Sequence, residues 1–212
     1  MNFLIYSLIH SWGYVRTLDT VVTDYVASFV DPAKQSARFP LLALEWSFHG
    51  VPWIFACAVA LLTSDSIAVQ QFWSNVLLGI AIDGGSVGLV KLVVQRPRPD
   101  LREFDMLAAA PGDQFSFPSG HTSRAAMLSV IFIHHLNLSM FSRLLAVLLP
   151  LLTGLSRLCL GRHFLSDVLA GLVYGYLEGL LMLWIWFDKH SVQAVLSLLF
   201  DSPTSYQGSI IN

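Results

Sequence analysis

The sequence predicts an all-α, polytopic membrane protein: a helical bundle of about five transmembrane spans, preceded by an N-terminal amphipathic interfacial helix. Of its 212 residues, 55% are hydrophobic and 12% are charged, about half of the charged fraction that is usual in soluble domains. The apolar residues also gather in runs of about 20, the length that crosses a bilayer. A soluble protein with a large buried core is the competing interpretation, and these run lengths argue against it.

Composition also narrows the set of partners. The formal net charge of −2 gives no indication of nucleic-acid binding. Eight of the twelve Lys and Arg residues lie between Lys91 and Arg162, so the positive charge is concentrated in one part of the chain. Cys57 and Cys159 are isolated in apolar stretches, which predicts neither a disulfide framework nor a zinc site.

The first region, residues 1–39, contains apolar residues at helical spacing from Val15 to Phe29, with Asp19 and Asp24 mostly off that face. This pattern predicts an amphipathic helix in the membrane interface. A surface helix packed on the bundle fits the same periodicity equally well. The region lacks a basic stretch and a small-residue cleavage site, so we do not interpret it as a removed signal peptide.

Five apolar runs make up the predicted transmembrane core, residues 40–187. Residues 96–118 are the longest connection and are rich in Pro, Asp and Arg. The C-terminal tail, residues 188–212, holds a second amphipathic stretch from Val192 to Phe200. The five spans are predicted near residues 41–63, 71–95, 120–138, 143–161 and 165–187.

The second and fifth predicted spans carry both acids and glycines. Asp83 and Glu178 are expected to face the bundle interior, because a charged group in lipid is costly. Glycines permit close approach of neighbouring helices. The two spans contribute three each: Gly84, Gly85, Gly88, Gly171, Gly175 and Gly179.

Three polar islands interrupt the apolar runs: Lys91–Pro99, Pro118–His121 and Ser156–Asp167. A membrane protein tolerates such groups only where they pair, meet water or do chemistry. Because successive spans alternate in direction, the span ends that carry the islands all reach the same membrane face. The sequence therefore predicts that the islands form one site.

The first island places Lys91 and Arg98 seven residues apart, about two turns of a helix. Pro97 and Pro99 predict that the helix ends before Arg98. Two cations near a helix end could bind an anion. Snorkelling side chains or positive-inside anchors explain the same pair.

The second island begins an apolar helix. Ser119 is a natural N-cap, and the free N–H groups of such a helix end attract phosphate. Gly120 permits close approach, and His121 in the first turn is able to donate a proton to a leaving oxygen. An ordinary capped helix with an interfacial histidine is the competing interpretation.

The third island is the most specific. His163 and Asp167 are four residues apart and share a helix face. An aspartate that accepts from one imidazole nitrogen fixes the tautomer and leaves the other nitrogen as a nucleophile. Arg157 supplies a planar donor fork that suits phosphate. A lone His–Asp pair is more often structural, but that interpretation does not easily explain the full pattern.

In order and spacing, the islands resemble the signature of the type 2 phosphatidic acid phosphatase superfamily: Lys-x6-Arg-Pro, Pro-Ser-Gly-His and Ser-Arg-x5-His-x3-Asp. The resemblance covers residues 40–187 and implies a membrane lipid phosphatase that needs no metal or other cofactor. It implies that His163 attacks phosphorus and forms a phosphohistidine, that His121 protonates the leaving group, and that Asp167 supports His163. The phosphoryl oxygens would be held by Lys91, Arg98, Ser119, Gly120 and Arg157. The sequence contains no acidic cluster suited to magnesium, so no metal ligand is assigned.

The residues around the islands most resemble the polyisoprenoid diphosphate phosphatase branch, whose best-known member acts on presqualene diphosphate. The stretches are Arg96–Pro99, Phe117–Ala125 and Gly154–His163. The expected substrates are presqualene, farnesyl and geranylgeranyl diphosphates or phosphates. Arg124 and Arg162 are candidates for contact with a second phosphate, or for pairing with an acid or headgroup.

Several alternatives stay open. They are a phosphatidate, sphingoid-base phosphate or phosphatidylglycerol-type phosphatase, a headgroup transferase, a transporter and a catalytically silent scaffold of the same fold. Intact motifs argue against the scaffold, and clustering of the charges at one face argues against the transporter. The sequence gives no oligomeric state.

The resemblance also implies an active site on the lumenal, extracytoplasmic face, in the endoplasmic reticulum or nuclear envelope if the source is eukaryotic. The only predicted partners are the bilayer and the lipid substrate. Asn137 lies in a glycosylation sequon on the opposite face and is expected to stay unmodified.

Overall fold

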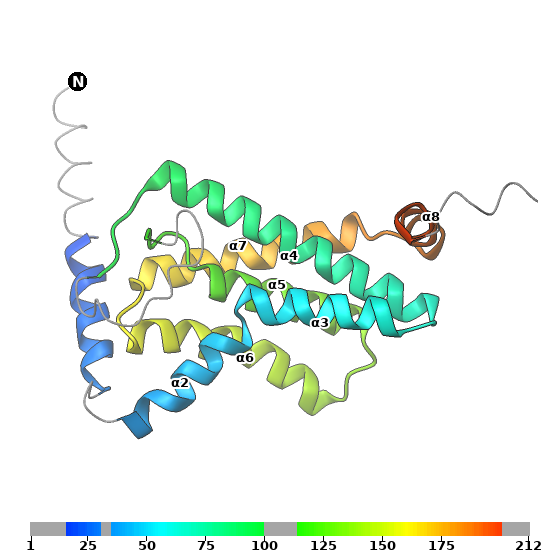
Figure 1. Cartoon of the computed structure of the whole chain (residues 1–212). Coiled ribbons are helices and arrows are strands. Elements are labelled where there is room, and N and C mark those ends of the chain that lie inside the picture. The colour runs from blue at the N-terminus through cyan, green and yellow to red at the C-terminus, as the bar shows by residue number, and fades with distance from the viewer. Residues whose placement is uncertain (1–15, 31–34, 100–113, 201–212) are drawn as a thin grey trace, which may run out of the picture.

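The structure is a computed structural model that describes residues 16–30, 35–99 and 114–200. Over this part the chain is α-helical, with a single antiparallel bridge between Pro97 and Phe115. A helix at residues 16–28 comes first. It is followed by α2 (Gln35–Ser47), α3 (Gly50–Thr63), α4 (Ile67–Val94), α5 (Gly120–His135), α6 (Met140–Cys159), α7 (Leu165–Trp184) and α8 (Lys189–Phe200) (Figure 1).

Among the described helices, α4, α6 and α7 are long and apolar enough to cross a membrane, and the bent pair α2–α3 makes a fourth candidate span. The first predicted span is therefore divided, with an angle of 48° between its two parts. Two residues account for the break: His49 caps α3 by accepting a hydrogen bond from the Val51 N–H, and Pro52 lacks the N–H that would continue α2.

The third predicted span, residues 120–138, begins where predicted but is shorter in the structure. The helix α5 has 16 residues, a length of about 24 Å, which is shorter than the hydrocarbon core of a bilayer. Three to four spans are thus supported by length and composition, where the sequence predicts five.

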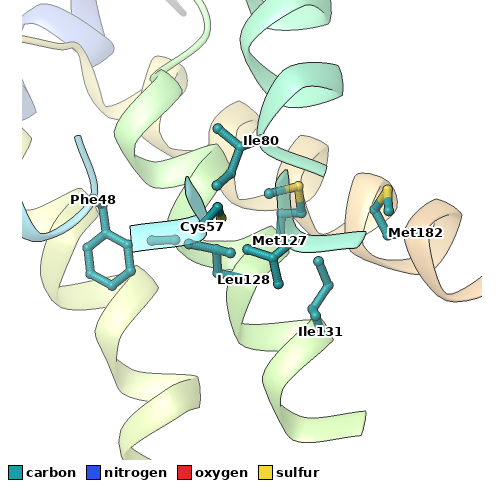
Figure 2. Packing of buried hydrophobic residues seen from close by; sticks show 9 residues of the cluster. Phe48, Cys57, Ile80, Met127, Leu128, Ile131 and Met182 are labelled. Carbon is teal, nitrogen blue, oxygen red and sulfur yellow. The ribbon is translucent and has the colours of Figure 1, made fainter. Parts of the chain in front are cut away.

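The helix α5 is the centre of the bundle and packs against α4, α6 and α7. Its Met127, Leu128 and Ile131 are buried and meet Met182 of α7 in one core cluster (Figure 2). Cys57 of α3 and Ile80 of α4 belong to the same cluster. Lipid tails are as apolar as these side chains, so close packing rather than removal from water holds such a core together.

The outer faces of the long helices are apolar and exposed. On α6, Leu144, Val147 and Leu151 are each about half exposed, and on α4 Val93 is 76% exposed. Exposed apolar side chains on helices of transmembrane length suit a lipid environment.

Glycines on α7 allow its close packing against α5. A Cβ placed on Gly175 would overlap the Ser123 backbone, and one on Gly179 would lie 2.6 Å from Val130. The prediction that glycines permit close helix contact is wrong for three positions of α4, because a Cβ there meets no atom of the described chain within 4 Å. These positions are Gly84, Gly85 and Gly88.

Replacement of Gly175 by alanine is expected to destabilise the protein, because the added methyl group must push α5 and α7 apart. Overpacking of this kind costs about 1–3 kcal/mol. The thermal unfolding midpoint in detergent would measure the loss. Gly85→Ala is the matched control, since it adds the same methyl group in open space and favours the helix. Equal midpoints for the two variants would contradict this packing.

Candidate active site

The three polar islands meet at one end of the bundle, where α4 and α6 end and α5 and α7 begin (Figure 1). Two hydrogen bonds to backbone carbonyls join them. The Ser119 N–H donates to the Asp167 carbonyl at 3.0 Å, which ties the second island to the third. The Arg98 guanidinium donates to the Arg162 carbonyl at 3.3 Å, which ties the first to the third.

His163 lies in the connection between α6 and α7 and is 1% exposed. Its Nδ1 is 2.8 Å from the Ser116 carbonyl oxygen. A carbonyl only accepts, so Nδ1 carries the proton and Nε2 carries the lone pair. Burial, followed by the positive charges of Arg157, Arg98 and Lys91, lowers the pKa of His163 well below its usual value. The imidazole is therefore neutral, as a nucleophile must be.

Asp167 does not make the predicted hydrogen bond with His163. Its Oδ2 is 3.7 Å from Nδ1, beyond hydrogen-bond distance. That oxygen instead accepts from the Phe164 N–H at 2.8 Å, and Oδ1 accepts from Arg96 at 2.8 Å. The reason is the position of Asp167 in the first turn of α7, where backbone N–H groups lack partners within the helix. Asp167 thus fixes the backbone next to His163, while the Ser116 carbonyl orients the ring.

His121 lies in the first turn of α5, with a buried Nε2 that has no hydrogen-bond partner among the described residues. Its ring centre is 5.7 Å from that of His49. A buried polar atom without a partner requires an explanation, and a substrate oxygen would provide one.

The start of α5 differs in detail from the predicted phosphate cradle. Ser119 occupies the N-cap position, but its hydroxyl pairs with the Thr122 hydroxyl at 2.9 Å instead of capping the helix. A Cβ on Gly120 would meet only Val87, at 3.4 Å. The first N–H groups of α5 have no partners within the helix and lie beside His121.

Arg157 is the most buried cation of the site, at 2% exposure. Its Nη1 is 2.9 Å from Glu45 Oε2 of α2, an ion pair without hydrogen-bond geometry. Arg162 lies 3.7 Å from the same oxygen. Lys91 is buried in the last turn of α4. A phosphoryl group that binds Arg157 would have to share this guanidinium with Glu45 or displace the carboxylate.

Arg124 pairs with an acid, the alternative to contact with a second phosphate. Its guanidinium lies 2.7 Å from Asp83 Oδ2 and donates to the Phe48 carbonyl at 3.1 Å. That carbonyl is left for Arg124 because Pro52 has no N–H to offer it. Asp83 is fully buried, so the pair supplies the internal partner that an acid in a membrane span needs.

Sequence reasoning missed four contributors to this end of the bundle: Asp19, Glu45, Arg96 and Ser116. Glu45 could have been found, because an acid inside a predicted span is expected to face the bundle interior. Asp19 and Ser116 offer no local signal, since their contacts join residues that are far apart in the chain. Arg96 lies within the first island but outside its spaced motif.

Comparison with known proteins places the chain in one family. The pattern of the PAP2 superfamily matches residues 72–191. The chain is 30% identical to the probable lipid phosphate phosphatase beta of Arabidopsis thaliana over 204 residues, 84% of this chain and 93% of the plant protein. It is 32% identical to the lipid A 1-phosphatase of Porphyromonas gingivalis over 142 residues, which cover 65% of this chain and 27% of that protein.

Among solved structures, the first transmembrane PAP2 type phosphatidylglycerolphosphate phosphatase from Bacillus subtilis shares the fold, with a TM-score of 0.63 at 23% identity. The superposition covers 86% of this chain and 92% of that one. The range matched by the family spans the three islands from Lys91 to Asp167. It confirms the superfamily predicted from the three islands: this integral membrane protein belongs to the PAP2 superfamily of phosphatases.

Proposed function

We propose that this protein hydrolyses lipid phosphates through a phosphohistidine on His163. The observation that carries the proposal is the contact between His163 Nδ1 and the Ser116 carbonyl at 2.8 Å, which leaves the lone pair on Nε2. In the first step Nε2 bonds to phosphorus as the bond from phosphorus to the leaving oxygen breaks. His121 donates a proton to that oxygen. Water then attacks the phosphohistidine and gives a proton to His121, so phosphate is released and both imidazoles return to their starting states.

The rest of the site positions the phosphoryl group and stabilises its charge, the main requirements of phosphoryl transfer. Lys91, Arg98 and Arg157 supply positive charge around His163. The backbone at Ser119 and Gly120 presents a helix N-terminus, which favours an anion. These groups are proposed to act without a metal ion.

Polyisoprenoid diphosphates are the proposed substrates. The support is the resemblance of the stretches that flank the motifs, together with the position of Arg162 beside the Arg157–Glu45 pair. There a second phosphate would meet a second guanidinium. Arg124 is not included, because Asp83 and the Phe48 carbonyl already engage its guanidinium.

In the proposed membrane arrangement α5 is a fifth, short span that its neighbours shield from lipid. The helix at residues 16–28 would lie in the interface, since its Leu18, Val21 and Tyr25 are each more than half exposed. The site would face the extracytoplasmic side, which is the lumen of the endoplasmic reticulum or nuclear envelope if the source is eukaryotic, and Asn137 would stay unmodified on the other side.

A substrate panel tests the proposal: farnesyl diphosphate, farnesyl phosphate, phosphatidate and sphingosine phosphate, each with purified protein in EDTA. The expected result is phosphate release that is fastest from farnesyl diphosphate and unchanged by EDTA. Faster release from phosphatidate would overturn the isoprenoid assignment. Loss of activity in EDTA would overturn the metal-free mechanism, and no release from any lipid would overturn the proposed function.

A further inference from the structure

The helix at residues 16–28 supplies hydrogen-bond acceptors to the start of α7. Asp19 Oδ1 accepts from the Ser166 N–H at 2.9 Å, and Oδ2 accepts from the Ser166 hydroxyl at 2.6 Å. The Thr23 hydroxyl accepts from the Leu165 N–H at 3.1 Å. The first N–H groups of a helix have no partners of their own, so two residues of a distant helix cap the segment that follows His163.

Arg96 connects this cap to Ser116 and Asp167, the two residues that hold His163 and its backbone in place. Its guanidinium joins Asp19 Oδ2 at 2.7 Å and Asp167 Oδ1 at 2.8 Å, and lies 4.0 Å from the centre of the Phe164 ring. Its carbonyl accepts from the Ser116 N–H at 2.8 Å. Ser116 in turn presents the carbonyl that binds His163 Nδ1. One residue therefore fixes the acceptor that orients the imidazole and the carboxylate that fixes the adjoining backbone.

The charges along this chain of contacts alternate: carboxylate, guanidinium, carboxylate. Burial alone would raise the pKa of Asp19, but hydrogen bonds from Arg96 and Ser166 outweigh it and lower the pKa below its usual value. Asp19 is therefore ionised at neutral pH. Loss of the Asp19 carboxylate would remove one of the two carboxylates that pair with Arg96 and the acceptor that caps Ser166.

We infer that Asp19, assisted by Thr23, is a positioning residue for the nucleophile: it holds Arg96 and the start of α7 so that His163 keeps its attacking orientation. The inference rests on the proposed role of His163. It gives the polar face of the N-terminal helix a function in catalysis that is separate from the membrane contact of its apolar face. Since misplacement of a reacting group by about 1 Å can cost 100-fold in rate, the effect should appear in kcat.

The test compares Asp19→Asn and Thr23→Val with matched controls on the same helix. Asp24→Asn makes the same change of charge at an exposed position. Thr20→Val removes an exposed hydroxyl that bonds only to the Arg16 carbonyl among the contacts observed in the described chain. The assays use the full chain, with farnesyl diphosphate and with phosphatidate, and with inorganic phosphate as a competitive inhibitor.

The expected result is a fall in kcat of about 10-fold to 100-fold for Asp19→Asn and a smaller fall for Thr23→Val. The inhibition constant for phosphate should not change, because the contacts observed for the two residues outside their own helix, in the described chain, are with Arg96 and the start of α7. Unchanged kcat in both variants would overturn the inference. A loss of phosphate affinity that accompanies the fall in kcat would also overturn it, because it would indicate a general collapse of the site. If Asp19→Asn does not fold, the kcat of Thr23→Val decides whether the inference stands. An inactive wild type would instead count against the proposed function.

Discussion

Replacement of His163 by alanine is expected to lower kcat by about 10⁴-fold or more, since the nucleophile is removed while the phosphate-holding groups remain. Rates of phosphate release by purified wild type and variant would measure the effect. Residual binding should persist, because Lys91, Arg98 and Arg157 are untouched. Inorganic phosphate should therefore still protect the variant against thermal unfolding.

The matched control is His134→Ala, which removes an exposed imidazole from the last turn of α5, at the opposite end of that helix from His121. Its activity should equal that of the wild type. A His163→Ala variant with substantial activity on lipid phosphate would contradict the assignment of the nucleophile.

Replacement of His121 by glutamine is expected to lower kcat for a lipid phosphate by about 10²-fold to 10⁴-fold, the usual contribution of a general acid. With p-nitrophenyl phosphate the loss should be much smaller, because nitrophenolate leaves without needing a proton. The comparison of the two substrates measures the role directly. Equal losses with both substrates would contradict proton donation by His121 and indicate a binding role.

The sequence predicted the long helices well because their signal is local. An unbroken apolar run is sufficient to place α4, α6 and α7 within a few residues of their ends. The break between α2 and α3 depends on a cap by the His49 side chain and on the missing N–H of Pro52. Hydropathy does not register either feature, so the first span was predicted as continuous. Hydropathy is also an insufficient guide to the short α5, because the burial of this helix depends on the helices packed around it.

The motifs predicted which residues meet but not which atoms pair. The spacing of His163 and Asp167 suggested a direct hydrogen bond between them. In the structure the imidazole instead donates to the Ser116 carbonyl. The Asp167 carboxylate accepts from the Phe164 N–H and from Arg96. Spacing identifies residues on a common helix face, whereas the partner of each atom depends on chains packed from elsewhere. The contact of Asp19 with Ser166 spans 147 positions and has no counterpart in any local pattern.

The central claim is that phosphoryl transfer passes through a covalent intermediate on His163. The stereochemical course at phosphorus tests it most directly, with a phosphate ester made chiral by three oxygen isotopes and an alcohol as the acceptor. Each in-line displacement inverts the configuration, so attack by His163 followed by attack of the acceptor predicts overall retention. Overall inversion would mean a single direct displacement and would contradict the phosphohistidine mechanism.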